Sequence, residues 1–130
     1  MNIGVIPARL GSSRFPKKIL ADLNGKPLVV HTVENVMKAK KLDKILLAID
    51  SEETQSALEK YNFDIIMTSK DHVSGTDRVA EVIDRISEAR IIINIQADEP
   101  LIDPKIIDSL VDSFKDNNVQ MSTAVSTRLT

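Results

Sequence analysis

Short apolar runs alternate with amphipathic segments from one end of the chain to the other. Apolar runs of about four to eight residues predict strands, and apolar residues three and four positions apart predict helices. The expected strands are residues 2–7, 44–49, 64–67, 90–95 and 120–125, and the expected helices are residues 29–39, 51–60, 76–87 and 104–114. Because the strands are apolar throughout, the pattern indicates a mostly parallel sheet covered on both faces, in a three-layer, Rossmann-like α/β fold.

The helix expected at residues 76–87 has the strongest signal. Its apolar side chains fall on one face and are Val79, Ala80, Val82, Ile83 and Ile86. The preceding Ser74-Gly75-Thr76-Asp77 has the form of a capping box. For the helix expected at residues 51–60, Asp50 is the predicted cap.

Composition bounds the class of protein. A chain of 130 residues with 42% apolar content suits one compact domain. It has no Cys, which excludes disulfides, thiolate metal sites and a cysteine nucleophile, and which fits a reducing compartment. Without a signal peptide or a run of roughly 18 apolar residues, we expect a cytoplasmic protein with no membrane partner. Acids slightly outnumber bases and aromatic residues make up 3%, so a single nucleotide is a better ligand candidate than a nucleic acid polymer.

One segment departs from the average charge of the chain. Residues 9–18 follow the first predicted strand and contain four cations and no acid, although the net charge of the chain is -2. Small residues let a backbone approach a ligand closely, and cations supply the counter-charge for phosphates. The residues concerned are Arg9, Gly11, Ser12, Ser13, Arg14, Lys17 and Lys18. This segment is a candidate phosphate cradle, and the alternative is a basic, solvated surface loop.

Two further segments, residues 69–78 and 96–100, also follow predicted strands. Ligands of open α/β sheets bind beyond the carboxyl ends of the strands, so both segments are expected near the cationic loop. Asp98 is a candidate Mg²⁺ ligand, because this ion uses one or two carboxylates together with phosphate oxygens. The alternative for Asp98 is a turn or capping role before Pro100, and Glu99 is either a second ligand or an exposed side chain.

Common phosphate-binding motifs are absent, because the four glycines are too scattered for a G-x-G-x-x-G or P-loop pattern. Asn24-Gly25 predicts a turn leading to a helix rather than a phosphate grip. His31 and His72 have no partner at metal-ligand spacing. A helical or capping role suits His31, whereas His72 adjoins a predicted helix N-terminus, which suits an anion or a polar ligand.

These segments, in this order, resemble the 3-deoxy-manno-octulosonate cytidylyltransferases, also called CMP-Kdo synthetases. The first motif is Ile6-Pro7-Ala8-Arg9 with Ser12-Ser13-Arg14-Phe15-Pro16 and Lys18, continued by Asn24-Gly25-Lys26-Pro27 and Val30-His31. The second is Asp71-His72 with Ser74-Gly75-Thr76-Asp77-Arg78, and the third is Gln96 with Asp98-Glu99-Pro100. Three motifs in order over nearly the whole chain make the resemblance specific.

The resemblance implies a nucleotidyltransferase that moves CMP from CTP to the anomeric hydroxyl of 3-deoxy-D-manno-octulosonate (Kdo), releases pyrophosphate and serves lipopolysaccharide assembly. Mg²⁺ is the implied cofactor, with Asp98 as its ligand. The implied catalytic residues are Arg9, Lys18 and Asp98. The implied nucleotide-binding residues are Arg9, Gly11, Ser12, Ser13, Arg14, Lys18, Ser74 and Gly75, and the implied sugar-binding residues are His72, Arg78 and Gln96.

Three positions depart from the family's pattern. Lys17 and Ala97 stand where it usually has Gly, and Ile19 where it usually has Pro. Ala97 would be strained if its backbone were left-handed, and Lys17 adds charge near the triphosphate.

The family's chains are also longer. In them the further part carries a second metal-binding Asp, much of the sugar pocket and a dimer-forming segment. We therefore expect residues 1–130 to be the nucleotide-binding portion of a homodimeric enzyme, weakly active or inactive alone.

Two other functions stay open at this stage. One is a cytidylyltransferase for another acidic sugar of the sialic acid type, against which Gln96 with Asp98-Glu99-Pro100 argues. The other is a non-catalytic nucleotide-binding module, which would bind CTP regardless of Mg²⁺ and of Asp98.

Overall fold

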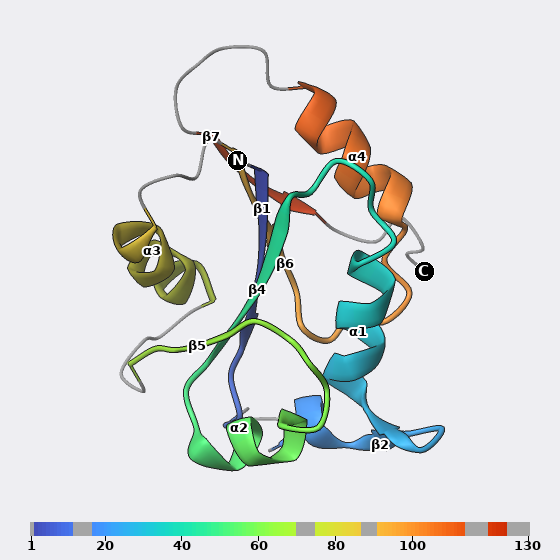
Figure 1. Ribbon diagram of the computed structural model, residues 1–130, viewed down its shortest axis with the longest axis vertical. Helices are drawn as coiled ribbons and strands as arrows, with labels where there is room; N and C mark the ends of the chain where they lie inside the picture. Colours follow the sequence, from blue (N-terminus) through green and yellow to red (C-terminus); the bar gives the residue numbers. More distant parts are fainter. Residues whose placement is uncertain (1, 12–16, 70–74, 87–90, 114–119, 125–130) are drawn as a thin grey trace.

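The computed structural model describes residues 2–11, 17–69, 75–86, 91–113 and 120–124 (Figure 1). Five parallel strands form one sheet in the order β5-β4-β1-β6-β7. They are β1 (Asn2–Ala8), β4 (Lys44–Ile49), β5 (Ile65–Met67), β6 (Ile91–Ile95) and β7 (Gln120–Ala124). Counted along the chain this order is 3-2-1-4-5, which begins the strand order of dinucleotide-binding doubly wound sheets. The predicted fold class is confirmed.

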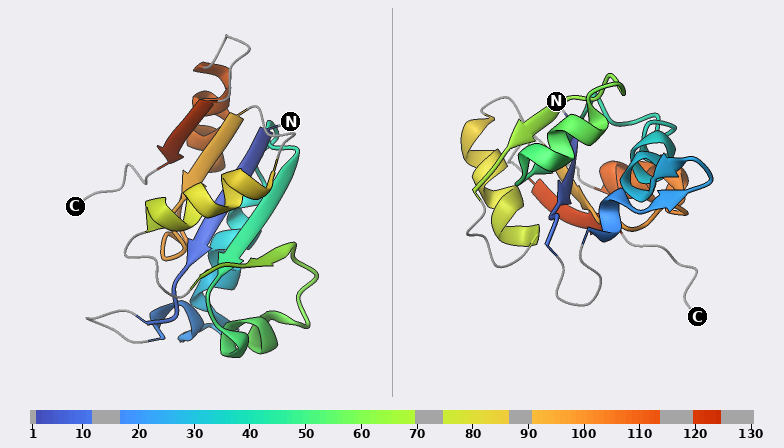
Figure 2. Two further views of the ribbon diagram at one scale, coloured as in Figure 1. Left: turned by 90° about the vertical axis from the view of Figure 1, so that its left-hand side faces the viewer. Right: turned by 90° about the horizontal axis from the view of Figure 1, so that it is seen from below.

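Helices cover both faces of the sheet, as the end-on view in Figure 2 shows. α1 (Leu28–Val36) and α4 (Pro104–Ser113) lie on one face, where their buried residues share a core with alternate residues of β1, β4 and β6. α3 (Gly75–Arg85) lies on the other face, where Val79 and Val82 pack against Ile3 and Val5. α2 (Glu52–Leu58) follows the carboxyl end of β4.

The connections on the α1 face differ in hand. From β1 the chain passes through α1 to β4 on one side, and from β6 it passes through α4 to β7 on the other side. Because both helices lie on the same face of a parallel sheet, the two crossovers have opposite hands. Nearly all such units are right-handed, so one of these two is an exception.

A short hairpin separates β1 from α1. Its strands are β2 (Asp22–Leu23) and β3 (Lys26–Pro27), and it follows the 3₁₀ helix η1 (Lys18–Leu20). Asn24 and Gly25 form the turn with φ angles of 54° and 89°. Two-residue hairpin turns require such positive φ values, which Asn and Gly tolerate best. The turn predicted from Asn24-Gly25 is therefore confirmed, although the sequence did not reveal the paired strands around it.

The C-terminus of α1 and the cap of α2 differ from expectation. α1 ends at Val36 instead of residue 39, because the amides of Lys38 and Ala39 bond three residues back, to Asn35 and Val36. The cap of α2 is Ser51, whose hydroxyl accepts a hydrogen bond from the Glu53 amide. The prediction that Asp50 caps this helix is wrong, since its carboxylate is turned to Leu10 and Arg78.

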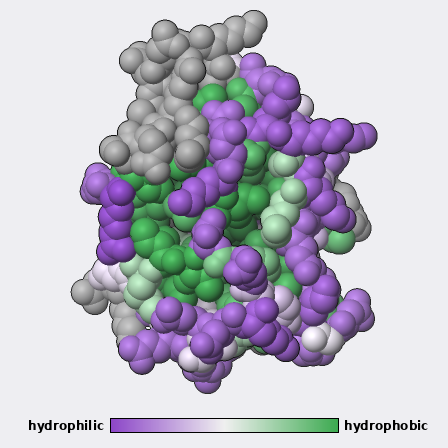
Figure 3. Space-filling view, in the orientation of Figure 1, coloured by the Kyte–Doolittle hydropathy of each residue, from purple (hydrophilic) through white to green (hydrophobic). Residues whose placement is uncertain are grey.

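Apolar side chains gather at the centre of the face seen in Figure 3. Between α1 and β4 a pocket is lined mainly by Val33, Met37, Ile45, Leu47 and Phe63. Because Ile45 and Phe63 lie near the amino ends of β4 and β5, this pocket is at the opposite end of the sheet from the segments predicted to bind ligand.

Candidate active site

The predicted ligand-binding segments meet at the centre of the sheet. β1 and β6 are neighbours, and the connections that leave their carboxyl ends run to opposite edges of the sheet. Ligands of open α/β sheets bind at such a point. The segment that begins at Arg9 leaves β1 here, and the segment that begins at Gln96 leaves β6 beside it.

Lys18 and Asp98 face each other across this crevice. Lys18 Nζ lies 3.1 Å from Asp98 Oδ2, and the two side chains are 44% and 43% exposed. Ile19, buried in the core, anchors η1 and so holds Lys18 at the crevice. On the other side, the Glu99 amide donates to the Gln96 carbonyl, which forms the turn that carries Asp98. An ion pair this exposed contributes about 0–1 kcal/mol, so incoming phosphates or metal can displace it at little cost.

The base of the cationic loop is closed by backbone contacts at Leu10. The Leu10 amide donates to Asp50 Oδ1 at 3.1 Å, and the Leu10 carbonyl accepts from the Lys17 amide at 2.9 Å. Lys17 Nζ also reaches Glu53 Oε2 on α2 at 3.1 Å. Leu10 and Lys17 therefore form a fixed base beside the carboxyl end of β4.

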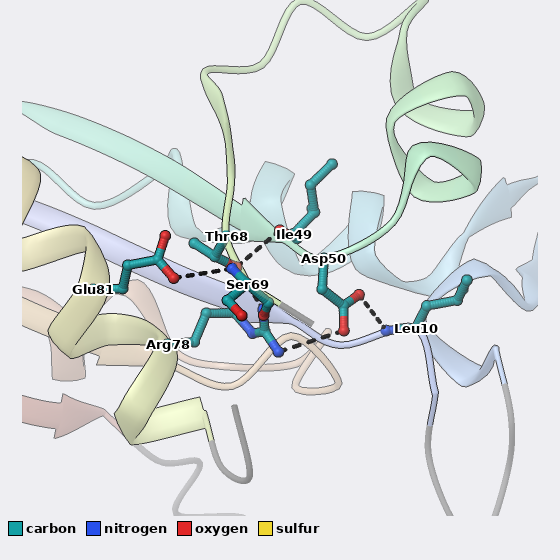
Figure 4. Close-up of polar contacts among 7 residues, drawn as sticks. All are labelled: Leu10, Ile49, Asp50, Thr68, Ser69, Arg78 and Glu81. Carbon is teal, nitrogen blue, oxygen red and sulfur yellow. Dashed lines mark hydrogen bonds and ion pairs between the residues drawn. The ribbon is translucent and has the colours of Figure 1, made fainter. Parts of the chain in front are cut away.

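Asp50 and Arg78 form a buried ion pair next to this base (Figure 4). Arg78 Nη2 lies 3.4 Å from Asp50 Oδ2, and the Arg78 side chain is only 1% exposed. Arg78 Nη1 donates to Thr68 Oγ1 at 2.5 Å and to the Ser69 carbonyl at 2.8 Å. The contacts join α3 to the carboxyl ends of β4 and β5.

Helix α1 holds the segment after β6. The buried Thr32 hydroxyl donates to the Ala97 carbonyl at 2.7 Å, and the Asn35 amide group donates to the Ile102 carbonyl. Both bonds connect the helix to the segment that carries Gln96 and Asp98. Its position is therefore set by α1 as well as by β6.

The structure brings together several of the predicted site residues. Arg9 is exposed directly after β1, Gly11 is exposed with open space around its Cα, and Gln96 is exposed directly after β6. Gly75 is the first residue of α3. Ser12, Ser13, Arg14, His72 and Ser74 lie outside the described residues. Their predicted contacts stay predictions.

Arg78 lies in the interior, whereas a residue that contacts a sugar is expected at the surface. Its guanidinium is buried and engaged with Asp50, Thr68 and Ser69. The direct sugar contact predicted for it is therefore not supported by this geometry and stays a prediction. His31 lies on α1, where its ring contacts the Leu23 carbonyl of the hairpin, which agrees with the expected helical role.

Lys17 and Ala97, which stand where the family usually has Gly, differ in backbone conformation. Lys17 has φ of 62°, a left-handed conformation, whereas Ala97 is not among the described residues with positive φ. The methyl group of Ala97 is buried in the core beneath the crevice. The strain considered for Ala97 is thus absent, and the unusual backbone belongs to Lys17.

Sequence reasoning missed two residues that shape the site. Asp50 follows the apolar β4 directly, so the strand-end rule that selected Asp98 would also have selected it. Thr32 had no comparable signal, because a hydroxyl on a helix face does not indicate which carbonyl it will meet.

The charges at the crevice fit a divalent cation shared with phosphates. Among the described residues no group of three or more His, Cys, Asp or Glu is placed to hold a metal. Mg²⁺ normally needs only one or two carboxylates when phosphate oxygens complete its shell, and Asp98 supplies one exposed carboxylate there. None of the helices in the described part of the chain is long and apolar enough to cross a membrane.

Open parallel α/β sheets with this strand order bind nucleotides at such a central crevice, where Lys18 and Asp98 face each other in this structure. Residues 3–128 match the family described as Cytidylyltransferase. The chain therefore belongs to the cytidylyltransferase family.

Individual relatives of this chain carry a more specific enzyme name than the family does. The chain is 48% identical over 105 residues to a 3-deoxy-manno-octulosonate cytidylyltransferase of a Nitratiruptor species, covering 79% of this chain and 43% of the relative. It is 44% identical over 128 residues to that of Geobacter sulfurreducens, covering 97% and 51%.

A solved structure of CMP:2-keto-3-deoxy-manno-octonic acid synthetase complexed with CTP matches with a TM-score of 0.82 and 40% identity, over 86% of this chain and 46% of that one. The chain spans about half the length of the relatives it matches.

Proposed function

We propose that the chain is the nucleotide-binding part of an enzyme that transfers CMP from CTP to Kdo and releases pyrophosphate. The observation that carries the proposal is the contact between Lys18 and Asp98 across the crevice. It sets a cation suited to phosphates beside a carboxylate suited to a metal, with both in reach of solvent. The similarity to a synthetase solved with CTP supports the choice of nucleotide, and the names of the relatives support the choice of sugar.

In the proposed reaction the anomeric hydroxyl oxygen of the sugar bonds to the α-phosphorus of CTP. The bond from that phosphorus to the pyrophosphate oxygen breaks, and the hydroxyl proton passes to solvent water. Such transfers depend mainly on positioning and charge neutralisation. Arg9 and Lys18 would hold the triphosphate and stabilise the charge on the leaving pyrophosphate, while the backbone from Gly11 onward would shape the loop around it.

Asp98 is the proposed protein ligand of Mg²⁺. Bound there with phosphate oxygens, the ion would neutralise the charge that opposes attack on the α-phosphorus. Gln96, exposed in the same segment, is the proposed sugar contact. The homodimer and the cytoplasmic location stay predictions, as does the weak activity of residues 1–130 alone.

The test compares CTP binding to the wild type and to Asp98→Asn by calorimetry, with and without Mg²⁺. With Mg²⁺ we expect the variant to bind at least about tenfold more weakly, about 1.4 kcal/mol, because it loses the metal's carboxylate. Without Mg²⁺ it should bind as well or better, because Lys18 is released from its ion pair. Asp103→Asn is the matched control, since it makes the same charge change at the N-terminus of α4, where Asp103 accepts from the Lys105 amide.

If CTP affinity is the same with and without Mg²⁺, and the same in the wild type and in Asp98→Asn, the result would instead support the non-catalytic nucleotide-binding module. In the whole protein, pyrophosphate release with Kdo but not with sialic acid is the expected result. The reverse preference would show that the sugar is another acidic one.

A further inference from the structure

Asp50 and Arg78 have no part in the proposed chemistry, yet both are charged and buried. Arg78 is 1% exposed and Asp50 is 8% exposed. Removing two charges from water is costly, and a buried ion pair is often no more stabilising than apolar residues of similar volume. Stability alone is therefore a weak reason for this pair, and its position suggests another.

The two carboxylate oxygens of Asp50 have separate partners, as Figure 4 shows. Oδ1 accepts from the Leu10 amide at 3.1 Å, and Oδ2 faces Arg78 Nη2 at 3.4 Å. Leu10 directly follows Arg9, and its carbonyl closes the loop by accepting from the Lys17 amide. One carboxylate thus fixes the residue at which the cationic loop both leaves and returns.

Arg78 holds Asp50 from the opposite side. Its Nη1 donates to Thr68 Oγ1 and to the Ser69 carbonyl, both just beyond β5. Thr68 in turn donates through its amide and its hydroxyl to the carbonyl of Ile49, the residue before Asp50. The Ser69 amide donates to Glu81, one turn further along α3. These contacts link the carboxyl ends of β1, β4 and β5 through a single guanidinium.

We propose that Asp50 and Arg78 are positioning residues for the nucleotide: they set the base of the cationic loop through the Leu10 amide without touching the ligand. The identity of the ligand rests on the proposed function. The contacts of Asp50 and Arg78 are observed in the structure and do not depend on the proposed function. A guanidinium is required because one terminal nitrogen reaches Asp50 while the other reaches the Thr68 hydroxyl and the Ser69 carbonyl, whereas an ammonium has a single nitrogen.

The first experiment measures amide hydrogen exchange in the wild type and in Asp50→Asn, without nucleotide. An amide side chain has one acceptor oxygen where the two contacts need two, so the Leu10 amide should lose protection. We expect the ratio of Leu10 to Val5 exchange rates to rise about tenfold, as a lost charge-assisted bond implies. Val82→Ala is the control, because Val82 is a buried core residue of α3, the helix that carries Arg78. It should raise exchange generally and leave the ratio unchanged.

The second experiment measures CTP affinity with Mg²⁺ in Asp50→Asn and Arg78→Lys, each checked for a folded state by circular dichroism. Both should bind about tenfold more weakly, while Val82→Ala should bind like the wild type. Should either variant unfold, Thr68→Val removes one partner of Arg78 together with the hydroxyl's bond to the Ile49 carbonyl, keeps the contact with Asp50, and should give a smaller loss in the same direction. Equal losses in Val82→Ala would mean that general destabilisation is the cause, and the positioning role would be rejected.

The two experiments separate this inference from the proposed function. If the wild type binds no CTP, the proposed function fails, and the exchange ratio still decides whether the pair positions Leu10. If CTP binds but the ratio and the affinity are unchanged in Asp50→Asn and Arg78→Lys, the positioning role is overturned while the nucleotide site stands.

Discussion

At the scale of single residues, backbone conformation at Lys17 controls how the cationic loop returns to the fold. Its amide closes the loop on Leu10, and its φ of 62° is the left-handed conformation that glycine adopts at least cost. A lysine in this conformation costs roughly 1–2 kcal/mol relative to the usual helical region. The family's usual glycine would avoid that cost, so this chain carries strain at the edge of its candidate site.

Lys17→Gly and Lys17→Ala should separate this strain from the role of the charge. Both variants lose the exposed ion pair with Glu53, which contributes at most about 1 kcal/mol. Only the glycine variant relieves the backbone, so it should be more stable than the alanine variant by about 1 kcal/mol. Urea unfolding measures the difference. Equal stability of the two variants would show that the left-handed backbone is not strained here.

At the scale of elements, α1 acts as the support for the segment that carries Asp98. The helix is amphipathic, and its buried face packs on the sheet. Thr32 on that buried face reaches the Ala97 carbonyl, and the half-buried Asn35 reaches the Ile102 carbonyl further along the same segment. A buried carbonyl left without a donor costs about 1–3 kcal/mol, so these side chains stabilise one arrangement of the segment.

Thr32→Val should therefore lower the free energy of unfolding by about 1–3 kcal/mol, although it preserves side-chain volume. Thr32→Ser is the matched control, because it keeps the hydroxyl and removes one methyl group, a loss of about 0.8 kcal/mol. Chemical denaturation should rank the serine variant above the valine variant. The opposite order would show that packing of the methyl group, and not the bond to Ala97, governs this contact.

At the scale of the whole molecule, the candidate site is formed by segments that follow two adjacent strands at the centre of the sheet. Lys18 follows β1 and Asp98 follows β6, and these strands are paired over Asn2 to Val5. A ligand that joins both sides is expected to bind only when the sheet is assembled. Binding of this kind adds directly to the free energy of unfolding.

CTP with Mg²⁺ at about 100 times its dissociation constant should stabilise the fold by about 2.7 kcal/mol. Urea unfolding with and without nucleotide measures this change, and UTP at the same concentration serves as the control. We expect a smaller effect of UTP, because the proposed enzyme uses cytidine. An unchanged midpoint with CTP would contradict nucleotide binding by this chain, and equal effects of the two nucleotides would contradict base selectivity.

Much of the local structure could be predicted because it follows from local physics. Apolar periodicity located the main strands and helices, and the strand-end rule selected Lys18 and Asp98, which the structure brings into contact. The hairpin strands β2 and β3 were missed because two residues carry no periodicity. Asp50 was misassigned because a capping role and a strand-end contact look alike in sequence.

By itself the sequence determined the order of strands and helices, the family and the cationic loop, because these depend on residues close together along the chain or on motifs in order. The tertiary structure alone decided that Asp50 joins Leu10 and Arg78, that Thr32 supports Ala97, and that α4 lies on the same face as α1. These contacts join residues 28 to 65 positions apart. Such pairings depend on which strands become neighbours and which face a helix covers, and neither is written in the local pattern of polar and apolar residues.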